Sequence, residues 1–156
     1  VKEGDGEIDD VVEIFNYYAD NGAEFGADEE IPNKRGGTSV MRKVPLGVIV
    51  GIMPWNFRYY QVARWAAPNL LLGNSLVLKH ASICPLSSQA CQDLLEDAGL
   101  PAGVFQNIYA SGSQMDAFVA DPRIAGVSLT FGACGWGCGC DSWRELQEVA
   151  AGARRK

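Results

Sequence analysis

The chain has 156 residues, 47% hydrophobic and 21% charged, and a formal net charge of −6; this excludes global disorder and collagen-like structure, and the acidic balance argues against a nucleic-acid partner. No apolar run reaches the ~18 residues of a membrane-spanning helix and no signal peptide is evident, so we expect a cytoplasmic protein without a membrane partner. Five cysteines, an odd number, fit a reducing compartment better than a disulfide framework.

The N-terminal segment is predicted to be an amphipathic helix followed by a connection. Apolar residues recur three and four positions apart over Ile8–Ala19, which is typical of a helix with one buried stripe. Asn21–Gly22 is the predicted end of this helix. Residues 22–39 are polar, rich in glycine and contain Pro32, so we interpret them as a connection. Four acidic residues lie where the positive end of the helix favours them: Asp5, Glu7, Asp9 and Asp10.

Beyond residue 40 the pattern alternates between strands and helices. Pro68 is expected to kink or shorten the first of these helices, which Gly73–Asn74 ends, and Gly99 ends the second. The alternation predicts an α/β fold with a parallel sheet, crossover helices on its faces and successive strands side by side. The predicted strands are Val44–Met53, Ser75–Lys79, Val104–Ala110 and Gly126–Thr130, and the predicted helices are Tyr59–Leu72, Leu86–Ala98 and Gln114–Ala120.

Ligands of such sheets bind beyond the carboxyl ends of the strands, so the residues that follow each strand are the candidates for a site. Asn56 could donate its carboxamide N–H to a developing oxyanion, or hydrogen-bond its own turn. Lys79 could hold a ribose hydroxyl or a phosphate, or remain a solvated charge. His80 is the only histidine, and we interpret it as a neighbour of the ligand site or a surface residue, not as a general base. A dinucleotide would be bound without the usual fingerprint, because neither a Gly-x-Gly-x-x-Gly sequence after the first strand nor a P-loop lysine motif is present.

A set of segments between about residues 40 and 130 carries a family resemblance. They are Val44–Phe57, which contains Pro-Trp-Asn-Phe, and Ala67–Ser75, Val77–Ser82, Ala98–Asn107 and Asp121–Thr130. Together and in this order they resemble the aldehyde dehydrogenase superfamily. The Tyr59–Trp65 helix and the Leu78-Lys79-His80 sequence are most similar to the succinate-semialdehyde dehydrogenase branch. The resemblance implies a partial Rossmann-like parallel sheet, the cofactor-binding domain of that family, with NADP or NAD as cofactor.

The resemblance also implies a reaction. In that family, whose enzymes are homo-oligomers, a cysteine thiolate attacks a small-molecule aldehyde to form a thiohemiacetal. Hydride then passes to the nicotinamide, and a glutamate-activated water releases the acid. By resemblance, Asn56 stabilises the oxyanion and Lys79 holds the adenosine ribose. The predicted cofactor-binding residues are Ile52, Met53, Pro54, Trp55, Asn56, Lys79, His80, Ala81, Ser82, Gly112 and Thr130, and no metal is expected.

Ser82 bears on the choice of cofactor. The family often has glutamate three residues beyond the ribose-binding lysine, and this chain has Ser82 there. A carboxylate would repel a 2′-phosphate, whereas a hydroxyl can donate a hydrogen bond to it. We therefore predict NADP over NAD.

Two features depart from the family. Arg58 stands where the family usually has a proline after Pro-Trp-Asn-Phe, and the loss of that rigid residue alters the geometry expected next to the oxyanion donor. The second departure begins at Phe131. There the family continues with Gly-Ser and a helix, and then with a strand that ends in Leu-Glu-Leu-Gly-Gly. This chain instead has a glycine-rich stretch with Cys134, Cys138 and Cys140.

This tail, residues 131–156, admits three interpretations. The cysteines could bind a metal, but they lack a standard zinc spacing and a fourth ligand. The glycines could form a phosphate loop, but the final glycine of the fingerprint is missing. The third interpretation is a reading-frame shift after Thr130. One set of synonymous codons for the tail, read one base later, translates into a sequence that resembles the family continuation and ends in Leu-Glu-Leu-Gly-Gly, so we favour this hypothesis.

The expected organisation therefore has three parts: an N-terminal helix and connection (1–39), a partial NAD(P)-binding domain (40–130) and a tail outside the family (131–156). The family's catalytic cysteine and glutamate would lie beyond the tail. Cys84 and Cys91 do not match the nucleophile, and we interpret them as structural thiols. We expect a fragment of an aldehyde dehydrogenase, acting on an aldehyde such as succinate semialdehyde in the parent enzyme and inactive alone. A non-catalytic nucleotide-binding module and an inert truncation product are the alternatives.

Overall fold

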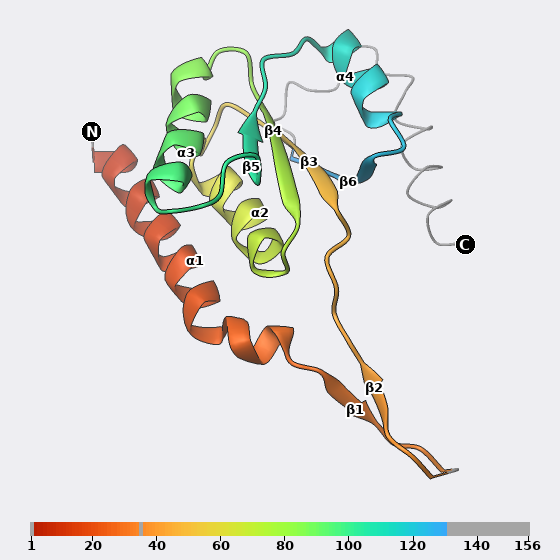
Figure 1. The fold of residues 1–156 in the computed structure, drawn as a ribbon. Helices are drawn as coiled ribbons and strands as arrows, with labels where there is room; N and C mark the ends of the chain where they lie inside the picture. The colour runs from red at the N-terminus through yellow and green to blue at the C-terminus, as the bar shows by residue number, and fades with distance from the viewer. Residues whose placement is uncertain (1, 35, 131–156) are drawn as a thin grey trace.

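A computed structural model of the chain describes residues 2–34 and 36–130 (Figure 1). The tail, with its three cysteines and its hypothesised change of reading frame, lies outside the described residues. No helix within the described ranges is both long enough and apolar enough to cross a membrane. The elements are α1 Lys2–Gly26, β1 Glu29–Ile31, β2 Ser39–Met41, β3 Val48–Met53, α2 Tyr60–Leu71, β4 Ser75–His80, α3 Pro85–Asp97, β5 Phe105–Asn107, α4 Gly112–Val119 and β6 Ile124–Leu129.

The last four strands form one parallel sheet in the order β5-β4-β3-β6. The predicted α/β class and the parallel pairing are confirmed. The prediction that successive strands lie side by side is wrong for β6, which pairs with β3 and places Val127 opposite Val50. Because crossovers are right-handed, the steps from β3 to β4 to β5 place α2 and α3 on one face, and the return to β6 places α4 on the other (Figure 1).

Each face of the sheet has its own hydrophobic core. On the face covered by α2 and α3, the fully buried Leu76 and Leu78 belong to one cluster with Trp65. On the opposite face, the fully buried Val50 clusters with Met115 and Val119 of α4. Strand β3 is therefore apolar on both sides, as expected for an interior strand of a parallel sheet.

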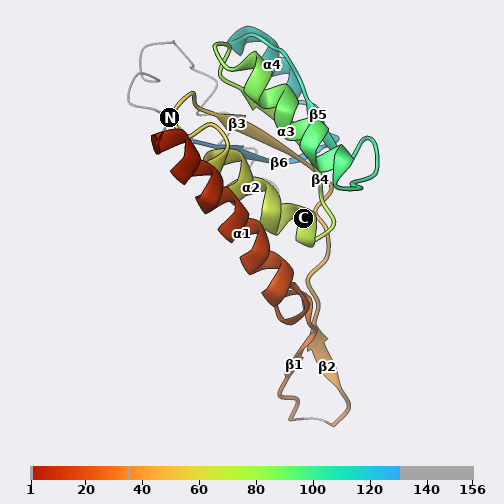
Figure 2. The ribbon, with the colours of Figure 1, turned by 90° about the vertical axis from the view of Figure 1, so that its left-hand side faces the viewer.

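Helix α1 is longer than predicted, because it continues past Asn21–Gly22 to Gly26. Gly22 is buried beside α2, and a Cβ at this position would collide with Cδ1 of Leu71. This glycine therefore permits close packing of α1 along α2 (Figure 2) and does not end the helix.

Helix α2 runs through Pro68 to Leu71, so the proline does not shorten it. The Asn69 side chain donates from Nδ2 to the carbonyl oxygen of Trp65 (2.7 Å), which supplies a partner to one of the carbonyls in the turn before the proline. Gly73 follows the C-cap Leu72 and stops the helix as predicted, with a φ of +81° that glycine adopts without strain.

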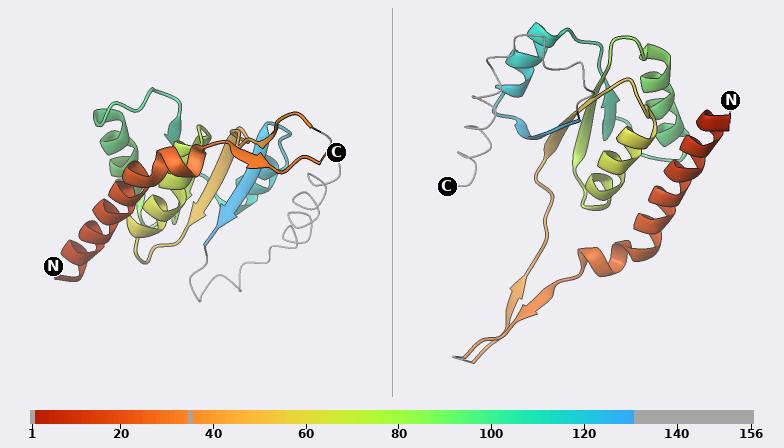
Figure 3. Two further views of the ribbon diagram at one scale, coloured as in Figure 1. Left: turned by 90° about the horizontal axis from the view of Figure 1, so that it is seen from below. Right: turned by 180° about the vertical axis from the view of Figure 1, so that it is seen from behind.

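Residues 22–39 are not only a connection. They contain the end of α1 and the strand β1, which pairs antiparallel with β2 so that Glu29 lies opposite Met41. Arg42 forms an ion pair with Asp28 at the base of this hairpin. The hairpin extends away from the parallel sheet (Figure 3). Strands of three residues are too short for their periodicity to be recognised in a polar, glycine-rich segment.

Candidate functional site

The order of the strands reverses between β3 and β6, and parallel sheets bind their ligands at the carboxyl edge beside such a reversal. The two strands stay paired to their ends, because the Thr130 N–H donates to the carbonyl oxygen of Ile52 (3.1 Å). The chain that leaves β3 therefore begins beside the end of β6. The structure thus brings Ile52–Asn56 and Thr130, all predicted site residues, to one place.

The segment Pro54–Tyr59, here called the Asn56 loop, connects β3 to α2. Phe57 has a φ of +50°, a conformation that costs a residue with a large side chain about 1–3 kcal/mol. Oδ1 of Asn56 is buried and has no hydrogen-bond partner among the described residues. A strained backbone and an unsatisfied polar atom side by side are typical of a binding site.

Glu7 of α1 holds the far end of the Asn56 loop. Its Oε1 accepts hydrogen bonds from the backbone N–H groups of Tyr59 (2.7 Å) and Tyr60 (3.1 Å). Tyr59 is the N-cap of α2 and makes no capping bond with its own side chain. The Glu7 carboxylate of α1 therefore caps α2, although the two residues are more than fifty positions apart in the sequence. In the sequence, Glu7 is predicted only to stabilise the positive end of its own helix, and the packing of α1 on α2 reveals this second role.

His80 joins the Asn56 loop to the end of β4. Its Nε2 lies 3.1 Å from the carbonyl oxygen of Arg58, and its Nδ1 accepts from the Ala81 N–H (2.8 Å). The side chain is 5% exposed, so the interpretation of His80 as a surface residue is wrong. Burial lowers the pKa of His80, and the charges of Lys79 and Arg58 lower it further. The hydrogen bond that the ring donates to the Arg58 carbonyl oxygen raises the pKa, and so does the Glu7 carboxylate.

Lys79 and Ser82, also predicted site residues at the end of β4, are less buried than His80. Lys79 is half-buried and, by the alternation of strand side chains, lies on the α4 face, opposite the face of His80. Ser82 is exposed in a turn that closes with a hydrogen bond from the Cys84 N–H to the carbonyl oxygen of Ala81 (2.9 Å). A cation and a free hydroxyl thus flank the end of β4, and both groups can bind a phosphate.

Gly112 lies apart from this group. It is the first residue of α4, which follows β5, and β4 separates β5 from β3. Ser111 caps α4 by accepting from the Gln114 N–H (3.4 Å), and Gln114 Oε1 accepts from the Ser111 N–H (2.8 Å). A Cβ at Gly112 would meet no atom within 4 Å, so packing among the described residues does not require glycine there.

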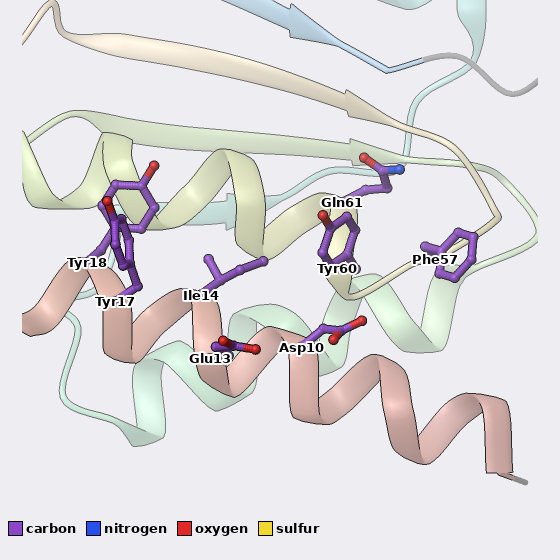
Figure 4. Close-up of a pocket in the computed structure, with 8 residues that line it drawn as sticks. All are labelled: Asp10, Glu13, Ile14, Tyr17, Tyr18, Phe57, Tyr60 and Gln61. Carbon is purple, nitrogen blue, oxygen red and sulfur yellow. The ribbon is translucent and has the colours of Figure 1, made fainter.

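A pocket that no sequence pattern predicts lies between α1 and α2. It has a volume of about 670 Å³. Figure 4 shows that Phe57 reaches it from the Asn56 loop, whereas Tyr60 and Gln61 belong to the first turn of α2. The pocket is therefore continuous with the loop that carries Asn56. Its lining residues are Asp10, Glu13, Ile14, Tyr17, Tyr18, Phe57, Tyr60 and Gln61.

The two cysteines of the described residues are buried. Burial raises the pKa of the Cys91 thiol to about 12, and the Glu7 carboxylate acts in the same direction. Cys84 is the N-cap of α3, and its Sγ lies 4.0 Å from the carbonyl oxygen of Trp55. A nucleophilic cysteine reacts as an accessible thiolate, and Cys91 is therefore unsuited to this role.

Comparison with known sequences identifies relatives of one enzyme class. A family model described as the aldehyde dehydrogenase family matches residues 1–133. An NADP-dependent succinate-semialdehyde dehydrogenase from Deinococcus radiodurans is 42% identical over 130 residues, covering 83% of this chain and 27% of that protein. A similar enzyme from Mycobacterium ulcerans is 44% identical over 118 residues, covering 74% of this chain and 26% of that protein. The chain thus spans about a quarter of the length of these relatives.

Solved structures give the same result for the fold. A succinic semialdehyde dehydrogenase from Streptococcus pyogenes, in complex with NADP+, matches 98% of this chain with a TM-score of 0.84 and 38% identity. A betaine aldehyde dehydrogenase from Staphylococcus aureus, in complex with NAD+, matches 97% with a TM-score of 0.82 and 29% identity. The match covers 32% and 29% of those chains.

Proposed function

Because the chain belongs to the aldehyde dehydrogenase family, we propose that it forms the nucleotide-binding part of an NADP-dependent enzyme that oxidises succinate semialdehyde to its acid. One observation carries this proposal: the strand order reverses beside β3, at the end of which the Asn56 loop begins. Sheets of this class bind dinucleotides at that position. NADP and succinate semialdehyde are the cofactor and substrate in the names of the relatives.

The chemistry of the strand ends fits NADP. Lys79 would bind the ribose or a phosphate with its ammonium group, and the exposed Ser82 hydroxyl would donate to the 2′-phosphate. The backbone of Ile52–Trp55 would line the cofactor. When bound, NADP would accept the hydride that leaves the aldehyde carbon. The residues of this chain bind and orient the reactants around that transfer.

Asn56 is the residue that we assign to the oxyanion. The strain at Phe57 indicates that this loop is shaped for a bound group. The unsatisfied Oδ1 is an acceptor and would pair with a donor, so the Nδ2 N–H is the part of Asn56 that would face the oxyanion. A carboxamide held in place can donate an N–H to an oxygen as negative charge develops on it. The pocket between α1 and α2 would receive the carbon chain of the aldehyde, because Phe57 connects it with the Asn56 loop.

We further propose that this chain binds the cofactor without turning over an aldehyde on its own. Cys91 is buried, and its raised pKa leaves little thiolate at neutral pH. Cys84 is buried with its Sγ directed at a backbone carbonyl oxygen. Neither thiol is placed to attack a substrate in the pocket.

Cofactor titration tests the proposal. Trp55 is exposed in the Asn56 loop, so we expect a saturable change of tryptophan fluorescence on adding NADP, and weaker binding of NAD. Lys79→Ala should weaken NADP binding at least about tenfold, because it removes a charge-assisted hydrogen bond. Lys34→Ala, on the distant hairpin, is the control. Absence of a saturable signal would refute cofactor binding, and NADPH formation by the pure chain with an aldehyde would refute the absence of turnover.

A further inference from the structure

We propose that His80 is a positioning residue whose neutral imidazole ties the Asn56 loop to the end of β4, and that a protonated ring leaves this buried position and so releases the tie. The contact is a property of the described residues themselves. Its consequence for cofactor binding rests on the proposed function.

The two hydrogen bonds of the ring select one protonation state. The Ala81 N–H can only donate, so Nδ1, 2.8 Å away, must hold a lone pair. Nε2 must then carry the proton, which it donates to the carbonyl oxygen of Arg58 at 3.1 Å. Only the neutral imidazole with its proton on Nε2 satisfies both partners. Each ring nitrogen serves a different loop.

Protonation leaves Nε2–H able to donate to the Arg58 carbonyl oxygen, but it removes the lone pair on Nδ1. The second proton would point at the Ala81 N–H, so that attractive contact would become a repulsive one. The charged ring would also be buried, since the side chain is only 5% exposed. Charged groups approach it from three elements: Lys79 from β4, Arg58 from the Asn56 loop and Glu7 from α1. Two of the three are cations, which further disfavours an imidazolium at this position. The protonated ring is therefore expected to leave its buried position for solvent, and its bond to the Arg58 carbonyl oxygen is lost with that movement.

The tie acts on Asn56 through the strained Phe57. A residue at a φ of +50° keeps this conformation only while its surroundings hold it. Arg58, the next residue, is held by His80, and Tyr59 is held by Glu7. Cys84 Sγ adds a weak contact to the carbonyl oxygen of Trp55 on the other side of Asn56. Loss of the His80 bond would allow Phe57 to relax and Asn56 to move with it.

Nuclear magnetic resonance of the imidazole nitrogens tests the tie directly in the whole chain. His80 is the only histidine, so the untagged protein gives a single imidazole signal. We expect the Nε2–H tautomer at neutral pH and a titration midpoint below the usual ~6.5. The backbone amide of Ala81 and the side-chain amide of Asn56 should shift with the same midpoint. The Nδ1–H tautomer, a midpoint at or above 6.5, or an Asn56 signal that ignores the titration would overturn the proposal.

Two variants separate positioning from simple packing. His80→Gln retains an amide N–H that can reach Arg58 but does not titrate, and His80→Ala removes both contacts. Between pH 7.5 and 5.5, wild-type affinity for NADP should fall about fivefold more than that of His80→Gln, the loss expected for one hydrogen bond. The 2′-phosphate titrates near pH 6 in all proteins alike, so only the difference between proteins is informative.

Leu78→Val is the matched control, because Leu78 is fully buried on the same strand and in the same core cluster. It should destabilise the chain without changing the pH dependence of NADP binding. Equal pH profiles for wild type and His80→Gln would refute the tie. If the wild-type chain bound no NADP, the proposed function would fail, and the tautomer and the Asn56 shift would still decide whether His80 joins the loops.

Discussion

Replacing Glu7 by alanine should lower the free energy of unfolding by about 2 kcal/mol. Its Oε1 accepts from the N–H groups of Tyr59 and Tyr60, which begin α2. Loss of a helix cap costs about 1 kcal/mol, with a range of about 0.5–2 kcal/mol. A negative charge at the first turn of a helix contributes about 0.3–1 kcal/mol more. The second N–H, left partly buried without an acceptor, adds a cost of similar size.

The Glu7→Gln variant separates the hydrogen bonds from the charge, because glutamine keeps an acceptor oxygen. It should cost about 0.5–1 kcal/mol, roughly the charge contribution alone. Urea unfolding followed by circular dichroism measures both variants. Asp9→Asn, an exposed position on the same helix, should change stability by less than about 0.5 kcal/mol. Equal effects of Glu7→Ala and Asp9→Asn would show that the carboxylate does not cap α2.

Three further predictions concern the core, the cofactor and the pH dependence. Gly51→Ala places a Cβ 2.7 Å from ring atoms of the buried Trp65, so it should cost about 1–3 kcal/mol in urea unfolding; Gly126→Ala, where a Cβ meets nothing within 4 Å, should cost clearly less. Ser82→Glu should shift the ratio of NAD to NADP affinity at least about tenfold toward NAD by fluorescence titration, and an unchanged ratio would remove Ser82 from the site. Folding lowers the pKa of His80, so the unfolded state binds more protons at this residue below pH ~6.5. The contribution of His80 to stability should therefore be constant above that pH and fall below it by up to about 1.4 kcal/mol per pH unit. The His80→Gln variant should lack this component, and an identical slope would contradict the assignment.

Local patterns in the sequence predict the parts of the site that lie on consecutive residues. An apolar, β-branched run followed by a polar turn is sufficient to place Asn56 after a strand, and the same holds for Lys79. These predictions succeed because a buried strand can be recognised from the hydrophobic pattern of its own residues. Only the strand bounds differ: β3 begins at Val48, not at Val44.

No local sequence pattern predicts the contacts that hold the Asn56 loop. Glu7 and Tyr59 are separated by 52 residues, and His80 and Arg58 by 22. A local argument gives Glu7 a sufficient role at the start of its own helix, so nothing in the pattern points to a second one. The pocket between α1 and α2 is hidden for the same reason, because its walls come from two helices whose packing is decided elsewhere. Gly22, which permits that packing, resembles a helix stop in sequence.

The reversal of strand order follows from an observation already present in the sequence. Residues 48–53 are apolar at both odd and even positions apart from Gly51, so both faces of this strand must be covered. Right-handed crossovers that move across a sheet in one direction place every helix on the same face. A strand with two apolar faces therefore requires the chain to return past it. That requirement is inconsistent with four successive neighbouring strands, and it is met here when β6 pairs with β3 and α4 covers Val50. The position of the candidate site is thus a consequence of how the second face of β3 is buried.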